Sequence, residues 1–161
     1  PHFLVLKFRN FLMVETDFAF RWLIRRDVFS VLSMLSIKES DLVAVLRKSN
    51  CIGIVLEDQR TLEIVGVVIY ELHKQEINIV FFGYDHNFTE NFFPAMVERM
   101  TDKLSQQRRR RLHVNVPEHD ISSQIRLSEL GFLGTQSDDM VVMSYYLHAQ
   151  PEFDDGQYGY F

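Results

Sequence analysis

The apolar positions of the chain follow two spacings, and each spacing predicts one type of element. Apolar residues three and four positions apart predict helices over residues 27–35, 41–48, 94–107 and 120–130. Short apolar runs predict strands over residues 19–25, 51–56, 63–72, 77–82, 112–116, 132–135 and 140–147. Residues 77–82 are nearly all apolar, which is typical of a central strand that is buried on both faces.

Residues with special backbone preferences mark the ends of these elements. Ser40 or Asp41 is a suitable N-cap for the second helix, and Gly131 is a natural stop for the last one. Pro94 is expected at the start of the third helix, because its missing N–H is unneeded there. Residues 58–60 predict a hairpin between two strands.

The order of elements predicts the fold class. Antiparallel hairpins combined with crossover helices indicate an α/β or α+β domain. We expect a mixed, mostly antiparallel sheet of about six to seven strands, flanked by about four helices. Residues 19–148 form this domain, residues 1–18 are an N-terminal extension or an extra strand, and residues 149–161 are an acidic, aromatic tail.

Composition excludes several classes of protein. The net charge of -5 argues against a DNA-binding domain, which is normally basic. No apolar run is long enough to span a bilayer. Cys51 is the single cysteine, so an internal disulfide and a cysteine metal cluster are excluded, and a reducing, cytoplasmic location is the simplest inference.

Several segments, in this order, carry a resemblance to a known family. They are Ile24-Arg25-Arg26-Asp27, Asn50-Cys51-Ile52-Gly53, the run Val65 to Lys74, and Leu130-Gly131-Phe132. Together they resemble the GNAT superfamily of N-acetyltransferases, most closely its ribosomal-protein-alanine branch. The resemblance implies that acetyl-CoA lies in a splayed central sheet, with the backbone of Ile79, Val80, Phe81 and Phe82 along its pantetheine arm. It also implies an acceptor opposite, either a protein N-terminus or a small amine, and leaves a homodimer open.

The segment after the fourth predicted strand departs from that family. The family pattern there is Gln/Arg-x-x-Gly-x-Gly/Ala, since glycines let the backbone approach the phosphates of the cofactor. This chain has Phe88-Thr89-Glu90-Asn91-Phe92-Phe93. The ring of Phe93 would compete with the phosphates, Glu90 adds a negative charge, and Pro94 lacks a donor. We therefore expect weak or absent acetyl-CoA binding. Asn91, Phe92 and Phe93 are assigned to the cofactor site only because they align with the family's cofactor-binding positions.

The catalytic and acceptor positions also differ. The resemblance places a base at Asn115 and an acid at Leu127, and neither side chain can do that chemistry near neutral pH. The family's asparagine beneath the cofactor aligns with Asp120, for which a helix N-cap is the simpler role. The links over residues 36–39 and 136–139 are short. In the family the corresponding links form the walls of the acceptor site, so short links suggest a different acceptor or none.

Three other side chains are candidate surrogate bases. His113 lies two residues before Asn115, so both side chains point to the same side of a strand. Glu71 and Glu76 lie near the turn that joins two central strands, and a water-relayed base there is a second option. For each, a structural or solvated role is the alternative.

The remaining charged and reactive residues suggest less specific roles. Asp85, His86 and His119 lack metal-ligand spacing, so no metal site is expected. Cys51 is expected to be a buried strand residue, with a nucleophile as the alternative. The run Arg108 to Arg111 either binds a phosphate, RNA or an acidic partner, or simply ends a helix, where cations are favourable.

Two functions therefore compete. One is a degenerate GNAT domain that acts by binding a partner, with Phe88, Phe92 and Phe93 filling the cofactor cleft or forming a contact patch. The other is an active acyltransferase with an altered grip on acetyl-CoA.

Overall fold

The structure is a computed structural model that describes residues 17–147. Nearly all of the expected N-terminal extension, and the whole tail over residues 149–161, therefore lie outside the described residues. Among the described helices, none is both long enough and apolar enough to cross a bilayer.

A seven-stranded sheet forms the centre of the domain, with strand order β1-β2-β3-β4-β5-β7-β6. Within it, β4 and β5 pair in parallel and the other neighbours pair antiparallel. The predicted mixed, mostly antiparallel sheet is confirmed. Its strands are β1 Phe18–Trp22, β2 Cys51–Asp58, β3 Ile64–Leu72, β4 Glu76–Tyr84, β5 Arg111–Pro117, β6 Leu133–Ser137 and β7 Met140–Tyr146.

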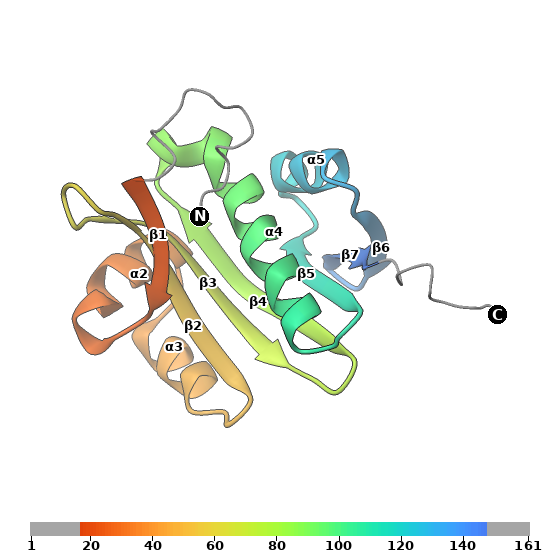
Figure 1. Cartoon of the computed structure of the whole chain (residues 1–161), viewed down its shortest axis with the longest axis horizontal. Helices are drawn as coiled ribbons and strands as arrows, with labels where there is room; N and C mark the ends of the chain where they lie inside the picture. Colours follow the sequence, from red (N-terminus) through yellow and green to blue (C-terminus); the bar gives the residue numbers. More distant parts are fainter. Residues whose placement is uncertain (1–16, 148–161) are drawn as a thin grey trace, which may run out of the picture.

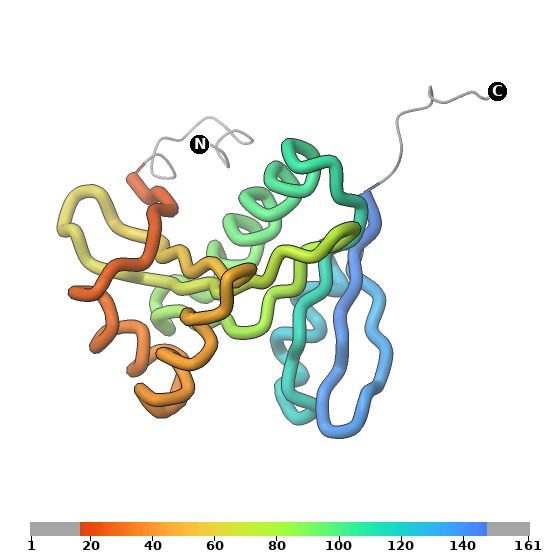
Figure 2. The backbone as a smooth tube through the Cα atoms, turned by 90° about the horizontal axis from the view of Figure 1, so that it is seen from below, coloured from red at the N-terminus to blue at the C-terminus, as the bar shows by residue number. Residues whose placement is uncertain are grey.

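Helices cover the two faces of the sheet unequally (Figure 1). Helices α2 (Val28–Leu35) and α3 (Glu39–Leu46) pack on one face, against β2, β3 and β4. Helices α4 (Thr89–Gln106) and α5 (Ile121–Glu129) pack on the other. In Figure 2 strands β5, β7 and β6 run side by side, and neither α2 nor α3 reaches them. Within residues 17–147, one face of these three strands is therefore left without a helix.

Two short 3-10 turns, η2 (Arg25–Asp27) and η3 (His86–Phe88), lead into α2 and α4. The prediction that Pro94 begins a helix is wrong, because α4 starts at Thr89 and contains Pro94. Burial of Phe92 and Phe93 in the first turns holds this segment helical, and it offsets the hydrogen bond that proline cannot make.

Other boundaries differ by a few residues. Helix α3 begins at Glu39 with Lys38 at the N-cap, so neither Ser40 nor Asp41 caps it. The first strand ends at Trp22, because the chain turns to bring Asp27 back onto Arg21. The predicted stop at Gly131 is confirmed by its positive φ of 102°, which only glycine adopts easily.

Strands β4 and β5 pair over only part of their length. Parallel pairing with β5 runs from Glu76↔Arg111 to Ile79↔Val114 and goes no further, although both strands continue. On the other edge of β4, Ile69 pairs with Phe81 and Tyr70 pairs with Ile79. Val80 is therefore skipped in the register with β3 and lies just beyond the last pair with β5, which places a β-bulge where β4 and β5 diverge.

Candidate functional site

The bulge decides where the four expected pantetheine-lining residues point. Ile79 and Phe82 pack towards α4, whereas Val80 and Phe81 both pack towards α2 and α3. The side chain of Ile79 is completely buried. Val80 has no partner residue on a neighbouring strand, because a bulged residue does not take part in the hydrogen-bond ladder. A ligand could therefore bind its backbone.

Aromatic rings fill the space between β4 and the first turns of α4. Phe92 is 0% exposed and Phe93 is 1% exposed. The ring centroid of Phe93 lies 5.6 Å from that of Phe82 and 5.5 Å from that of Tyr84, both in edge-to-face geometry. Phe92 stacks on Tyr84 at 4.8 Å. These contacts are favourable aromatic pairs, so the rings are part of the core.

The rest of the aligned phosphate segment is more polar. Asn91 is exposed, and the side chain of Glu90 is 86% exposed, 4.0 Å from Nη1 of Arg126 on α5. Nε of Arg126 is buried and has no hydrogen-bond partner among the described residues.

Burial and then the charge of Asp120 raise the pKa of the nearby Tyr84 hydroxyl. Phe88 packs away from this region, against Phe18, with ring centroids 4.6 Å apart.

The three family positions have distinct structural roles. Leu127 is completely buried beneath α5, so its side chain is part of the core. Asp120 caps α5: it accepts from the N–H of Ser123 at 3.2 Å and from the hydroxyl of Ser123 at 2.7 Å. Asn115 lies on the helix-free face of β5, and its side chain has no hydrogen bond within the described part of the chain.

His113 lies on the same face of β5, between two hydrogen-bonding partners. Its Nδ1 is 2.7 Å from Oγ of Ser144 on β7, and its Nε2 is 3.3 Å from Oε1 of Glu76 on β4. Arg111 Nε is 3.5 Å from the same Glu76 oxygen. The sequence points to His113 and Glu76 separately and carries no signal for Ser144, since only the pairing of β5 with β7 places it opposite His113.

Glu71, the other candidate base, is already engaged. Its carboxylate lies 3.0 Å from Lys48 Nζ and 3.0 Å from His73 Nε2. The hydrogen bond from Lys48, helped by that from His73, holds the pKa of Glu71 below its usual value despite burial. A carboxylate with a lowered pKa is a weaker base.

The less specific candidates remain separate from this site. Among the described residues, no group of three or more potential ligands could hold a metal ion, and Asp85 instead accepts from the N–H of Asn87. Burial raises the pKa of the Cys51 thiol, which makes it less reactive. Arg109 donates to the carbonyl of His73 and to Gln107, so this member of the basic run has a structural role at the end of α4.

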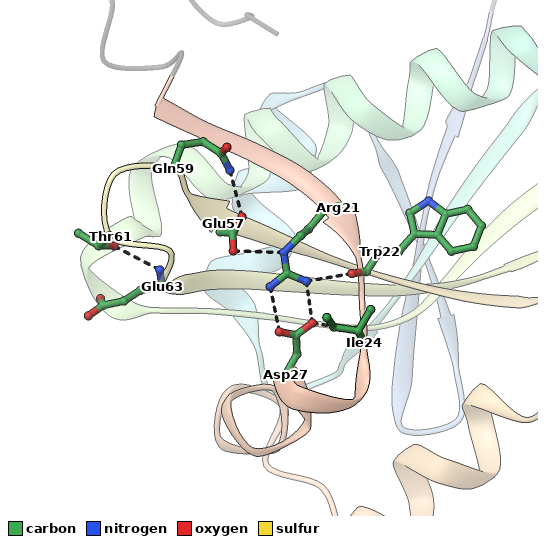
Figure 3. A network of polar contacts seen from close by, with 8 residues as sticks. All are labelled: Arg21, Trp22, Ile24, Asp27, Glu57, Gln59, Thr61 and Glu63. Atoms are coloured by element: carbon green, nitrogen blue, oxygen red, sulfur yellow. Dashed lines mark hydrogen bonds and ion pairs between the residues drawn. The ribbon is translucent and has the colours of Figure 1, made fainter.

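A second polar network lies at the opposite end of the sheet (Figure 3). The guanidinium of Arg21 donates to both carboxylate oxygens of Asp27, at 2.8 and 2.9 Å, and its Nε lies 3.2 Å from Glu57. Oδ2 of Asp27 also accepts from the N–H of Ile24. A polar cavity of about 570 Å³ borders this network. The network fixes the step from β1 into α2.

Comparison with known proteins supports the fold and leaves the activity open. No family model matches the chain, and no curated protein matches its sequence. Among solved structures, Ard1 from Thermoplasma volcanium is similar, with a TM-score of 0.70, 15% identity, and coverage of 82% of this chain and 99% of that one. The ribosomal-protein-S18-alanine N-acetyltransferase from Escherichia coli gives a TM-score of 0.70 at 13% identity, covering 89% and 99%.

A GNAT family acetyltransferase from Elizabethkingia anophelis, whose structure has acetyl-CoA bound, gives a TM-score of 0.62 at 11% identity, covering 81% of this chain and 99% of that one. The expected GNAT fold is therefore confirmed. At these identities the similarity establishes architecture alone.

Proposed function

We propose that the chain is a degenerate GNAT-fold domain that acts by binding a partner and lacks the usual grip on acetyl-CoA. One observation carries the proposal. Phe93, aligned with a glycine or alanine of the phosphate segment, is 1% exposed and packs edge-to-face on Phe82 and Tyr84. An aromatic ring replaces a bare backbone where the cofactor's phosphates would meet amide groups.

The surrounding residues support the same proposal. Moving the Phe93 ring aside would expose a buried aromatic side chain, at a cost of roughly 1.5–3 kcal/mol. Glu90, in the first turn of α4, would repel the phosphates. Leu127, at the position that the resemblance assigns to the catalytic acid, is buried in the core and has no proton to donate.

An active acyltransferase is the second candidate, and the bulge favours it. Val80 is unpaired where β4 and β5 diverge, and a splayed sheet is the feature that the family uses to hold an acyl thioester chain. A thioester is already reactive, and positioning alone can supply much of a rate enhancement. In this case the acceptor is a protein N-terminus or a small amine, and the protein acts in the cytoplasm.

Isothermal titration separates the two candidates. Acetyl-CoA and CoA are titrated separately into the wild-type chain and into Phe93→Gly, whose fold is checked by circular dichroism. We expect no heat of binding at millimolar ligand for the wild type. Micromolar binding by the wild type would contradict the proposal and favour the enzyme. A gain of binding in Phe93→Gly would identify the ring as the obstruction.

A further inference from the structure

The helix-free face of β5 and β7 holds a chain of three polar groups that the proposed function does not use. From its geometry we propose that Ser144, His113 and Glu76 form a hydrolytic site for small, activated acyl esters. The site lies on the face opposite α4 and α5, and it needs no acetyl-CoA. It is therefore independent of whether the cofactor cleft is functional.

The hydrogen-bond pattern assigns a role to each group. A carboxylate can only accept, so Nε2 of His113 donates its proton to Glu76 across 3.3 Å. In that tautomer Nδ1 carries the lone pair, and the Ser144 hydroxyl donates to it across 2.7 Å. The hydroxyl proton thus already points at a base, which is the arrangement that activates a serine nucleophile.

The face is open to a substrate. Leu133, directly opposite Ser144 on β6, is 72% exposed, and Tyr146, two residues along β7, is 53% exposed. These apolar side chains flank Ser144 on the same face and offer a surface for a short acyl chain. The side chain of His113 is 17% exposed, so it is sheltered from bulk water but not sealed.

A donor for the developing oxyanion is also present. Asn115 follows His113 by two residues, so its side chain lies on the same face, and it pairs with Val142, two residues before Ser144. This diagonal relationship places it within reach of a group bound at Ser144. Its amide has no hydrogen bond within the described chain and is available to donate.

The reaction proceeds in two balanced steps. Oγ of Ser144 attacks the ester carbonyl while Nδ1 of His113 takes the hydroxyl proton, and this proton then passes to the departing alkoxide, which leaves as an alcohol. A water molecule, deprotonated by Nδ1, attacks the acyl-serine. The carboxylic acid leaves, and the proton returns to Oγ. Glu76 is a positioning residue that holds the ring and stabilises its charged form.

Other charged groups face the imidazole as well. On this face β4 contributes Glu76, β5 contributes Arg111, and β7 contributes the hydroxyl of Tyr146, which is opposite Arg111. Nε of Arg111 lies 3.5 Å from the Glu76 oxygen that His113 also contacts.

The test combines covalent labelling with kinetics. A fluorophosphonate is incubated with the wild-type chain, Ser144→Ala and Ser137→Ala, and each intact mass is measured. Ser137 is an exposed serine on the edge strand β6 and serves as the matched control. We expect one label per chain in the wild type and in Ser137→Ala, and none in Ser144→Ala. Hydrolysis of p-nitrophenyl acetate should fall by about 10²-fold or more in Ser144→Ala and His113→Gln.

Glu76→Gln distinguishes a positioning role of Glu76 in catalysis from a purely structural role. It should lower the rate and shift the pH profile while retaining the label on Ser144. Circular dichroism confirms that each variant is folded. The proposal is overturned if the folded wild type takes up no label, if Ser144→Ala still takes up the label, or if Ser144→Ala hydrolyses the ester at the wild-type rate.

Discussion

Gly66 of β3 lies directly against the ring of Phe92 of α4. A Cβ added at Gly66 would lie 2.8 Å from Cε1 and 2.9 Å from Cδ1 of that ring. Both atoms belong to a completely buried aromatic side chain with little freedom to move. The first turns of α4 therefore approach the sheet at a position where β3 has no side chain.

This contact predicts that Gly66→Ala destabilises the protein by about 1–3 kcal/mol, because the added methyl overpacks the core. Chemical denaturation monitored by tryptophan fluorescence measures the change in the free energy of unfolding. Gly134→Ala on β6 is the comparison, and it should cost less: its new Cβ would meet the sulfur of Met143 at 3.0 Å and Cγ1 of Val141 at 3.1 Å, whereas at Gly66 it would meet two atoms of one rigid ring below 3.0 Å. Equal losses in the two variants would contradict the explanation.

Phe93 should be a core residue as well as an obstacle to cofactor binding. Truncation to alanine should cost about 3–5 kcal/mol, through lost burial and the cavity left beside Phe82 and Tyr84. The control is Phe29→Ala on α2, where the ring is 86% exposed and the change should stay within about 0.5 kcal/mol. A small effect at Phe93 would mean that the ring is not packed as described.

The Arg21–Asp27 pair should dominate the local stability of the β1–α2 step. Asp27 is 3% exposed, and Asp27→Asn removes the charge that offsets the guanidinium of Arg21, at a cost of about 3 kcal/mol. Arg60→Gln, which breaks ion pairs of a side chain that is 61% exposed, should cost less than about 1 kcal/mol. Thermal unfolding of the two variants measures the difference.

The same pair predicts a dependence of stability on pH. Burial alone would raise the pKa of Asp27, but the hydrogen bonds from Arg21 and from the N–H of Ile24 lower it below its usual value. A lowered pKa stabilises the folded state above the unfolded pKa of about 3.9, and this contribution disappears as the pH falls through the folded value. The wild type should lose stability below about pH 4, and the part of the loss due to Asp27 should be missing in Asp27→Asn.

Asp120 should act as a helix cap. Asp120→Ala should cost about 1 kcal/mol, since the N–H and the hydroxyl of Ser123 lose their acceptor. Asp120→Asn should keep most of the stability, because asparagine caps equally well. If both variants are as stable as the wild type, the carboxylate has a role other than capping.

Local patterns were sufficient for most of the fold. The predicted strands overlap all seven observed ones, and Gly131 marked the end of α5, because burial and a positive φ leave traces in sequence. Strand β6 is the exception, since all of its residues are exposed. The start of α4 was missed, since its helical state depends on Phe92 and Phe93 meeting the sheet rather than on Pro94.

By itself, then, the sequence determined the order of elements, the mixed sheet and the residues at the family's positions. Tertiary structure alone decided what those residues do. It buried Phe93 against β4, left Val80 unpaired at the divergence of β4 from β5, and placed Ser144 beside His113, 31 residues away in the chain. The reason is physical: periodicity reports which face of an element is apolar, whereas hydrogen bonds between strands depend on a register that no local pattern contains.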